Sequence, residues 1–281
     1  MALIGSGIGP SLTPALHERE AAALGLTYSY ARLDLDVLGV PAQAVGDLVA
    51  AARAEGLDGL NITHPCKQLV LRHLDELSPE AAALGAVNTV VFDDVGRAVG
   101  HNTDWSGFTR SFERGLPTVP RERVVLLGAG GAGAALAHAL LVGGTRELTV
   151  LDVEPTRART LASVVAARFP AARAVAGSLE NLAAEFSGTD GVVHATPTGM
   201  AAHPGTPFDV ALLPSAAWVV DVVYRPLETE LLRAARAAGH LVLDGGGMAV
   251  FQAVDSFRLF TGREPDAERM LAHFQTLARV A

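Results

Sequence analysis

The chain has 281 residues, of which 49% are hydrophobic and 19% are charged, and this composition is that of a globular protein with one large or two modest domains. Its net charge of −8 argues against nucleic acid or an anionic membrane surface as a main partner. The single cysteine excludes an internal disulfide framework, and the first residues lack the pattern of a secretory signal, so we expect a cytoplasmic protein.

The first hundred residues alternate short strands with helices, which predicts a small parallel sheet with covering helices. Pro14 suits the first turn of a helix, and Ser11 or Thr13 just before it is expected either to cap that helix or to bind a ligand. The expected strands are Ala2–Ile4, Tyr28–Leu33, Gly59–Thr63, Ala86–Asp93 and Ala98–His101, and the expected helices are Pro14–Leu24, Pro41–Glu55, Lys67–Leu74 and Pro79–Leu84.

A glycine-rich stretch in the middle of the chain has strand–turn–helix order. The apolar run Val124–Leu127 has the length of a strand, and an Ala-rich helical pattern extends to about Val142. The turn between them reads G-x-G-x-x-G, which allows a tight turn, a close backbone approach to a pyrophosphate and close packing of helix on strand. The helix start then presents N–H groups to phosphates. We therefore predict a dinucleotide cradle at Gly128, Ala129, Gly130, Gly131, Ala132 and Gly133.

An acidic residue ends the next predicted strand, Glu147–Leu151. Asp152 follows it at about the 20-residue spacing expected for a carboxylate that binds the adenosine ribose. Such a carboxylate accepts the ribose hydroxyls of NAD and repels the 2′-phosphate of NADP. Arg157 softens this repulsion, but Glu154 adds negative charge, so we predict NAD rather than NADP, with Arg157 also beside the cofactor.

Strands and helices continue to alternate toward the C-terminus, which predicts a parallel sheet with helices on both faces. Residues 124–145 carry no charge, but their clustered glycines argue against a membrane span. The loop Thr196–Pro207 follows a strand on the cofactor side, so we expect Thr196 and Met200 near the nicotinamide. The other expected helices are Trp105–Arg114, Pro155–Arg168, Leu179–Phe186, Thr229–Ala238, Met248–Phe260 and Asp266–Val280, and the other strands are Ala172–Val175, Val192–Ala195, Trp218–Val222 and Leu241–Leu243.

Three polar residues lie at the ends of predicted elements, where a site forms more readily than on a solvated helix face. Lys67 follows the strand Gly59–Thr63, Asn88 opens a strand, and Asp104 opens a helix. Oxidation of a carbinol needs a group that takes the hydroxyl proton and a cation near the developing oxyanion, and a lysine–aspartate pair suits both tasks. The residues alone leave open that Asp104 is a helix cap and Lys67 a solvated lysine. The histidines show no metal-ligand spacing, and we predict no metal.

Six short motifs occur in an order that resembles the shikimate/quinate dehydrogenase family over nearly the whole chain. The pairing of N-x-T-x-P-x-K with N-T-D ahead of a glycine-rich loop is the most specific part of the resemblance. The motifs are Ser11-Leu12-Thr13-Pro14, Asn61-Ile62-Thr63-His64-Pro65-Cys66-Lys67, Gly85-Ala86-Val87-Asn88-Thr89, Gly100-His101-Asn102-Thr103-Asp104, Gly128–Gly133 and Met248-Ala249-Val250-Phe251-Gln252-Ala253.

The resemblance implies an α/β fold of two domains that meet at an interdomain cleft. Residues 1–103 plus 245–281 would form the substrate domain, and residues 104–244 a Rossmann-type doubly wound domain that binds NAD. The implied reaction is the reversible oxidation of a ring hydroxyl of quinate or shikimate to the 3-dehydro ketone by hydride transfer. The implied site residues are Lys67 and Asp104 as the acid–base pair, Thr63, Asn88 and Gln252 for the ring hydroxyls, Ser11 and Thr13 for the carboxylate, and Tyr224 in the same pocket.

The chain departs from the biosynthetic members of the family in two places. Thr13 replaces the second serine of their Ser-x-Ser-Pro pattern, and the chain continues after Leu151 as Asp-Val-Glu-Pro instead of a basic Asn-Arg-Thr-like clamp. Both departures favour an NAD-dependent quinate/shikimate dehydrogenase of the catabolic type. An NADP-preferring biosynthetic shikimate dehydrogenase, an amino-quinate or amino-shikimate dehydrogenase, and a redox-sensing regulator that binds NAD without turnover stay open.

The sequence leaves two further choices open. One methyl group in a pocket changes a substrate preference by only about 1–3 kcal/mol, so quinate and shikimate cannot be ranked. No exposed apolar patch can be identified without a fold, so we expect either a monomer or a homodimer.

Overall fold

The computed structural model describes residues 1–280 and divides into two compact units. Unit 1 joins Met1–Gly107 to the C-terminal segment that starts at Ala249, and unit 2 is Phe108–Met248. Both limits fall inside helices, α5 (Asp104–Gly115) and α10 (Gly246–Thr261). Each unit has one six-stranded sheet, which confirms the predicted α/β class. The limits of the substrate and cofactor domains placed at residues 103 and 244 stay a prediction about function.

The sheet of unit 1 has the order β2-β1-β3-β5-β6-β4. The strands β1, β2 and β3 are mutually parallel, β5 runs antiparallel to β3 and β6, and β4 pairs parallel to β6. The C-terminal ends of β1, β3 and β6 therefore lie at the same edge as the start of β5. The strands are β1 (Ala2–Gly5), β2 (Ala31–Asp34), β3 (Gly59–Ile62), β4 (Glu76–Leu77), β5 (Thr89–Phe92) and β6 (Ala98–His101).

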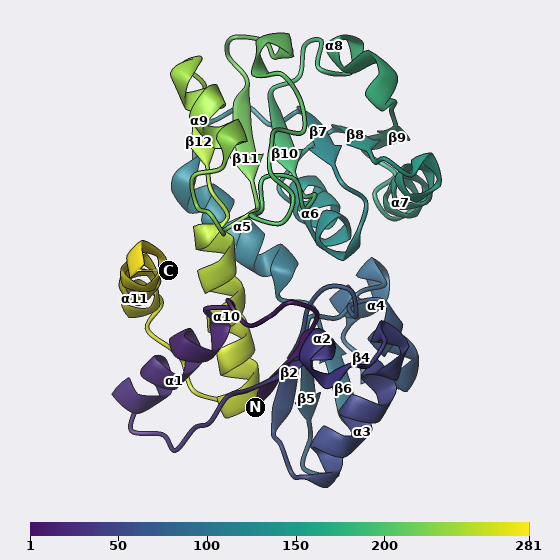
Figure 1. The fold of residues 1–281 in the computed structure, drawn as a ribbon. Coiled ribbons are helices and arrows are strands. Elements are labelled where there is room, and N and C mark those ends of the chain that lie inside the picture. Colours follow the sequence, from purple (N-terminus) through teal and green to yellow (C-terminus); the bar gives the residue numbers. More distant parts are fainter. Residues whose placement is uncertain (281) are drawn as a thin grey trace. The chain divides into compact units, whose positions relative to one another are not determined.

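Helices cover both faces of this sheet (Figure 1). Leu60 and Ile62 of β3 belong to the apolar cluster that also contains the buried residues of α3 (Val45–Ala54). Asn61 lies between them and faces the other way, because successive strand residues point to opposite faces. That second face lies toward the helices α1 (Thr13–Ala23), α10 and α11 (Ala267–Val280). The short elements are α2 (Leu35–Leu38), α4 (Pro79–Leu84) and the 3₁₀ helices η1 (Ala42–Ala44) and η2 (Leu69–His73).

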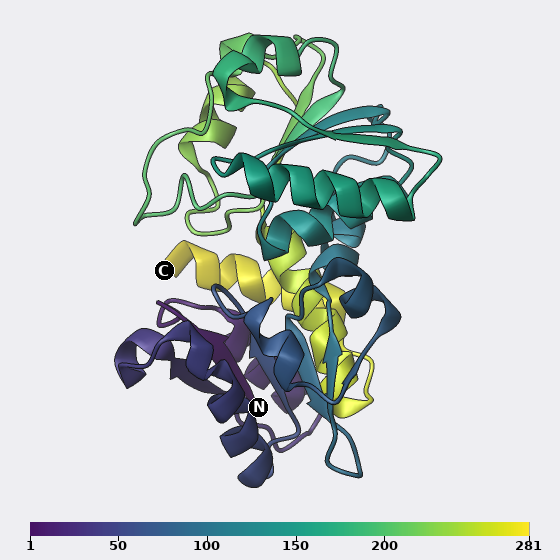
Figure 2. The same ribbon diagram turned by 90° about the vertical axis from the view of Figure 1, so that its right-hand side faces the viewer.

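The sheet of unit 2 is parallel throughout, with the order β12-β11-β10-β7-β8-β9. This is the doubly wound order, with the change of direction between β7 and β10. Helices α6 and α7 lie on one face, and α8 and α9 on the other (Figures 1 and 2). The elements are β7 (Arg123–Leu127), α6 (Gly131–Val142), β8 (Glu147–Leu151), α7 (Pro155–Arg168), β9 (Arg173–Ala176), η3 (Leu179–Asn181), α8 (Leu182–Glu185), β10 (Gly191–His194), η4 (Val210–Leu212), β11 (Trp218–Asp221), α9 (Glu230–Ala237) and β12 (Val242–Leu243).

Three predicted elements differ from the structure because a competing hydrogen bond intervenes. The helix predicted over Lys67–Leu74 is only the 3₁₀ helix η2, because the Lys67 carbonyl accepts the N–H of Val87 instead of a helical N–H. The helix predicted over Leu179–Phe186 breaks at Asn181, whose side chain caps a new helix by accepting the N–H of Ala184. The strand predicted from Tyr28 begins at Ala31, since the N–H of Tyr30 bonds the Glu18 side chain.

Within residues 1–280, no helix combines the length and the apolar character that crossing a membrane requires. The most apolar helix, α6, has 12 residues and packs inside unit 2, where most of its side chains are buried.

Candidate active site

Most of the residues that the sequence assigns to the substrate gather at one edge of the unit 1 sheet. The loop after β1 leads to Ser11 and Thr13, and Thr63 and Lys67 follow the end of β3. Asn88 directly precedes β5, and Asp104 comes shortly after the end of β6. The mixed strand directions of this sheet therefore bring together motifs that lie far apart in the sequence.

Lys67 and Asp104 form a close ion pair at this edge. Lys67 Nζ donates to Asp104 Oδ2 over 2.5 Å, and the two side chains are 17% and 7% exposed. Both alternatives that the sequence left open are therefore wrong: Lys67 is not a solvated lysine, and the Asp104 carboxylate bonds Lys67 rather than capping its helix. The backbone N–H of Asp104 is instead held by Asn102 Oδ1 at 3.0 Å.

Asn88 holds the second oxygen of the Asp104 carboxylate. Its Nδ2 group donates to Asp104 Oδ1 and to Thr103 Oγ1, both at 2.9 Å. Its Oδ1 accepts the backbone N–H of Thr103 at 2.7 Å. Asn88 is buried, so its amide holds the Asp104 carboxylate in position, and its contact with a substrate stays a prediction.

The loop after β1 is held against the segment that carries Thr63. Gly5 leaves no room for a side chain, because a Cβ there would lie 2.3 Å from the Thr63 methyl group. The N–H of Ser6 donates to the His64 carbonyl, and the Asp34 carboxylate accepts the N–H groups of Gly7 and Ile8. These contacts fix the start of the loop that carries Ser11 and Thr13.

Ser11 and Thr13 are both half-buried at the start of α1. Ser11 Oγ accepts the N–H of Thr13 at 3.3 Å, while the N-cap residue of the helix is Leu12, which offers no side-chain cap. The Thr13 side chain therefore does not cap the helix. The Ser11 carbonyl also accepts a hydrogen bond from the Arg32 guanidinium at 3.0 Å.

Gln252 lies on α10 and is half-buried. Its backbone packs against Gly107, where a Cβ would lie 2.7 Å from the Gln252 nitrogen. Because Gly107 belongs to the first turn of α5, this close approach places Gln252 beside the helix that begins with Asp104. Its Nε2 donates to the Ala249 carbonyl at 2.9 Å.

The glycine-rich turn of unit 2 has the shape that a pyrophosphate requires. Gly128 has φ +105°, and a Cβ on Gly133 would lie 1.9 Å from the Gly128 carbonyl oxygen, so neither position tolerates a side chain. Gly130 has nothing within 4 Å of its missing Cβ, and no side chain caps α6 there. The start of α6 thus combines free space with N–H groups, which suits a phosphate.

Asp152 ties the end of β8 to this turn. Its Oδ2 accepts the N–H of Ala129 at 2.7 Å, and its Oδ1 accepts the N–H of Glu154 at 2.8 Å. The carboxylate is therefore oriented and half-buried beside the glycine-rich turn, while Glu154 and Arg157 are exposed.

A buried histidine–aspartate pair, which the sequence did not reveal, holds the loop after β10. His194 Nδ1 donates to Asp221 Oδ1 at 2.9 Å, and both side chains are fully buried. His194 Nε2 bonds Thr196 Oγ1 at 2.5 Å, and the same oxygen accepts the N–H of Thr198. Asp221 Oδ2 in turn accepts the Thr229 hydroxyl. The sequence signal that could have revealed this pair is that one apolar strand ends in a histidine and the next one ends in an aspartate.

The remaining predicted residues of unit 2 lie in the loops that follow β10 and β11. Met200 is exposed, after Gly199 at φ +95°. Tyr224 follows the end of β11 and is half-buried. Since Tyr224 belongs to unit 2 and the Lys67–Asp104 pair to unit 1, its contact with the substrate stays a prediction.

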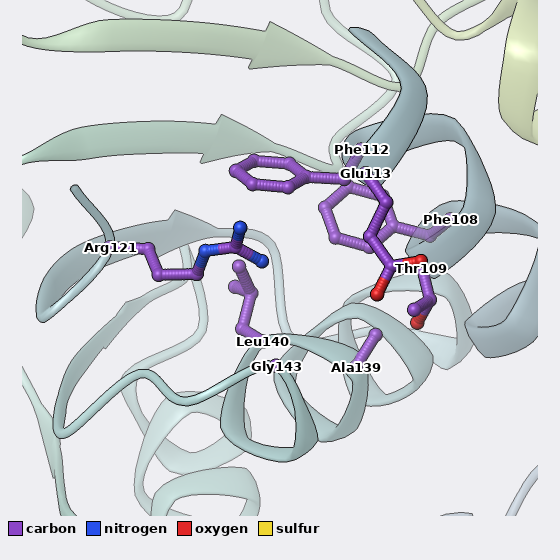
Figure 3. A pocket seen from close by; sticks show the side chains of 8 residues that line it. All are labelled: Phe108, Thr109, Phe112, Glu113, Arg121, Ala139, Leu140 and Gly143. Atoms are coloured by element: carbon purple, nitrogen blue, oxygen red, sulfur yellow. The ribbon is translucent and has the colours of Figure 1, made fainter. Parts of the chain in front are cut away.

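A hollow in unit 2 contains none of the predicted site residues (Figure 3). The Arg121 guanidinium extends into it, with its Cζ 5.0 Å from the centre of the Phe112 ring. Within residues 1–280 no three His, Cys, Asp or Glu side chains are grouped so that they could hold a metal ion. The hollow is lined by Phe108, Thr109, Phe112, Glu113, Arg121, Ala139, Leu140 and Gly143.

The chain matches two family models and several well-covered relatives. The models are the shikimate dehydrogenase substrate binding domain, over residues 3–90, and the shikimate 5′-dehydrogenase C-terminal domain, over residues 245–273. A protein of Streptomyces avermitilis named shikimate dehydrogenase (NADP(+)) is 65% identical over 99% of this chain and 96% of its own. One of Corynebacterium efficiens named quinate/shikimate dehydrogenase (NAD(+)) is 49% identical over 99% of this chain and 98% of its own.

A solved structure of a relative has the same fold as this chain. The quinate dehydrogenase of Corynebacterium glutamicum, in complex with NAD, is 49% identical and superposes with a TM-score of 0.90 over 98% of both chains. The predicted resemblance is thereby confirmed, and the chain belongs to the shikimate/quinate dehydrogenase family.

Proposed function

We propose that the protein is an NAD-dependent dehydrogenase that reversibly oxidises a ring hydroxyl of quinate or shikimate to the 3-dehydro ketone. The observation that carries this proposal is the Lys67–Asp104 pair, a short ion pair at the sheet edge where the other substrate residues gather. The family relatives support the reaction class, since their names combine shikimate or quinate with NAD or NADP.

The pair handles the proton that the reaction releases. NAD, held by the glycine-rich turn, would supply the acceptor for the hydride of the carbinol carbon. The Lys67–Asp104 pair takes the hydroxyl proton as the C–O bond becomes a carbonyl. In the reverse direction the lysine ammonium stabilises the negative charge that develops on the carbonyl oxygen and returns the proton. Asp104, bonded on its other oxygen by Asn88, keeps the lysine in one place through both directions.

The rest of the edge supplies groups for a polyhydroxylated carboxylate. The hydroxyls of Ser11 and Thr13, at the start of α1, bind the substrate carboxylate in this proposal. Thr63, Asn88 and Gln252 bind the ring hydroxyls, since each lies beside the segment that carries Lys67 or Asp104. Tyr224 of unit 2 is also proposed to contact the substrate.

The cofactor assignment depends on Asp152. In the proposed complex the turn from Gly128 to Gly133 holds the pyrophosphate, Arg157 lies beside the adenosine end, and Thr196 and Met200 lie beside the nicotinamide. The oriented Asp152 carboxylate suits a ribose with two free hydroxyls and repels a 2′-phosphate. The relatives divide between NAD and NADP, and the one at 65% identity is named for NADP, so an NADP-preferring shikimate dehydrogenase is the second candidate.

One assay panel tests the proposal. Purified protein is supplied with quinate, shikimate or their amino analogues and with NAD or NADP, and reduction is followed at the nicotinamide absorbance band. We expect turnover of quinate or shikimate with a higher kcat/KM for NAD than for NADP, whereas the reverse cofactor order would favour the second candidate. Binding of NAD without turnover of any of these substrates would point to a regulator and overturn the proposal.

The Lys67→Ala variant tests the residue that carries the mechanism. We expect kcat to fall by at least a thousandfold (roughly 4 kcal/mol in the barrier), because both the proton acceptor and the oxyanion partner are lost. NAD affinity, measured by calorimetry, should stay within about twofold because Lys67 and the glycine-rich turn belong to different units. A Lys67→Ala enzyme with nearly full turnover would remove Lys67 from the reaction.

A further inference from the structure

We propose that Tyr30, Asn61 and Thr89 are positioning residues that form, with Asn88, a one-way chain of hydrogen bonds ending on the Asp104 carboxylate. This inference rests on the proposed function, because it assigns these buried side chains the task of holding Asp104 for the reaction. Neither the motifs nor the resemblance had assigned a role to any of the three.

The chain consists of four consecutive hydrogen bonds. The Tyr30 hydroxyl donates to Asn61 Oδ1 at 2.6 Å, and Asn61 Nδ2 donates to Thr89 Oγ1 at 3.1 Å. The Thr89 hydroxyl donates to Asn88 Oδ1 at 3.0 Å, and Asn88 Nδ2 donates to Asp104 Oδ1 at 2.9 Å. Lys67 Nζ closes the series from the opposite side by donating to Asp104 Oδ2.

The backbone fixes the direction of every bond. Asn61 Nδ2 also donates to the Asn88 carbonyl at 3.2 Å, and a carbonyl can only accept, so the oxygen of the Asn61 amide must face the Tyr30 hydroxyl. Asn88 Oδ1 accepts the N–H of Thr103, which can only donate, so the nitrogen of the Asn88 amide must face Asp104. Thr89 accepts from one amide and therefore donates to the other.

All four bonds thus point toward the negative charge on Asp104. Donors aligned in one direction polarise one another, and the effect is stronger where water is excluded. Every member is well shielded, with Tyr30 6%, Asn61 4% and Thr89 0% exposed. Burial also raises the pKa of Tyr30 well above its usual value, so the phenol stays a donor at working pH.

The sheet explains how the chain of bonds is assembled. Asn61 on β3 and Thr89 on β5 are direct antiparallel partners, and both point to the face opposite the Leu60–Ile62 cluster. Polar side chains buried on a sheet face are costly unless their polar groups are hydrogen-bonded, and here the side chains of Tyr30, Asn61 and Thr89 are all bonded. The side-chain bonds that offset this cost lead, one after another, to the proposed catalytic carboxylate of Asp104.

Substitution of Thr89 separates its hydroxyl from its packing. Thr89→Val keeps the shape and loses the hydroxyl, whereas Thr89→Ser keeps the hydroxyl and loses the methyl group. We expect Thr89→Val to lower kcat about tenfold with an unchanged KM for NAD, and Thr89→Ser to stay within about twofold of the natural enzyme. If the residue served only packing, Thr89→Ser would be the weaker enzyme or the two variants would be equal, and either result would overturn the proposal.

The far end of the chain offers a matched pair of tyrosines. Tyr30→Phe removes the first donor, while Tyr28→Phe removes a neighbouring hydroxyl that bonds His17 Nδ1 instead. We expect kcat to fall severalfold in Tyr30→Phe and to stay within about twofold in Tyr28→Phe, with the melting temperature of each recorded to account for folding. Equal kcat values in the two variants would limit the positioning role to Asn88 alone and contradict the proposal as stated.

Failure of this inference is distinguishable from failure of the proposed function. If the natural protein oxidises quinate or shikimate and Lys67→Ala does not, the function holds, and the Thr89 and Tyr30 variants then decide the role of the bonded chain. If the natural protein turns over none of these substrates, the proposed function has failed, and no kcat effect can be assigned to these residues.

Discussion

Asn88 illustrates how one side chain can be assigned too narrow a role. The family resemblance implied that Asn88, just before β5, binds a ring hydroxyl. The structure shows an amide whose N–H groups donate to Asp104 and Thr103 and whose oxygen accepts from Thr89 and Thr103. An Asn88→Ala variant would therefore loosen Asp104 as well as weaken substrate binding. Loss of kcat and an increase in substrate KM are expected together at this position.

Asp152 carries the prediction about cofactor choice. Asp152→Ala removes the negative charge that would face a 2′-phosphate and the acceptor for the ribose hydroxyls. We expect the ratio of kcat/KM for NAD to that for NADP to fall at least tenfold (about 1.4 kcal/mol), measured with the better of the two substrates.

The neighbouring acid provides the control for this prediction. Glu154→Ala removes the same charge from an exposed residue two positions later. A cofactor ratio that changes equally in both variants would show a general effect of charge, and an unchanged ratio in Asp152→Ala would contradict the ribose assignment.

At the scale of elements, the loop after β10 depends on one buried contact. The Thr196 hydroxyl bonds the His194 ring, and its oxygen also accepts the N–H of Thr198. These two hydrogen bonds fix the conformation of the loop. Its methyl group lies 3.1 Å from where a Cβ of Gly128 would be, which ties the loop to the glycine-rich turn. The loop is therefore held in place by His194 at the end of β10 and Asp221 at the end of β11.

The His194→Ala variant should release this loop. We expect the KM for NAD to rise about tenfold, because the loop must then be ordered by the cofactor at the cost of binding free energy. His240→Ala is the matched control, since His240 is also buried in unit 2 but bonds the Ala217 carbonyl, next to the start of β11. If the two variants lose stability to the same extent and both keep the natural KM, the His194–Asp221 pair serves folding only.

Local patterns predicted most elements correctly and failed where a distant residue intervenes. The strand–glycine–helix order of β7 and α6 follows from residues within one stretch, and so it was predictable. The shortening of the helix after Lys67 depends on Val87, twenty positions away, which takes the Lys67 carbonyl. The pairing of Asn61 with Thr89 and of His194 with Asp221 likewise depends on strand register, which a single sequence does not specify.

At the scale of the whole molecule, His17 links stability to pH. Burial lowers the pKa of His17 to about 3, and the neutral ring is bonded by Tyr28 and Ser256. The unfolded chain, with an ordinary histidine pKa near 6.5, binds a proton that the folded chain does not. This contribution to stability is therefore complete above pH 6.5 and is lost progressively as the pH falls toward 3.

Thermal unfolding across this range measures the effect. Between pH 6 and 4 the natural protein should lose about 1.4 kcal/mol per pH unit more than a His17→Gln variant, because only the natural protein gains that proton on unfolding. His101 and His273, whose pKa values burial also lowers, occur in both proteins and cancel in the difference. Parallel stability curves for the two proteins would show that His17 is protonated in the folded state.

The whole-molecule prediction of two α/β sheets succeeded because strands and helices alternate along the entire chain. What the alternation could not supply is the path of the C-terminal segment. Glu20 of α1, only 1% exposed, binds Arg269 of α11 through its side chain at 2.6 Å, and Ser106 Oγ bonds Asp255 of α10. These long-range pairs are individually ordinary and become recognisable only in three dimensions.

The place of α10 and α11 in unit 1 has a consequence for biosynthesis. A ribosome delivers the sheet of unit 1 first, yet two of the three helices on the Asn61–Thr89 side of that sheet, α10 and α11, are translated only after unit 2. Unit 2 is contiguous and fully emerged earlier, so we expect it to fold first although it is encoded second. Until α10 and α11 are translated, the nascent polypeptide carries a sheet face that only α1 covers, and messages truncated before α10 should yield chains that chaperones and proteases capture.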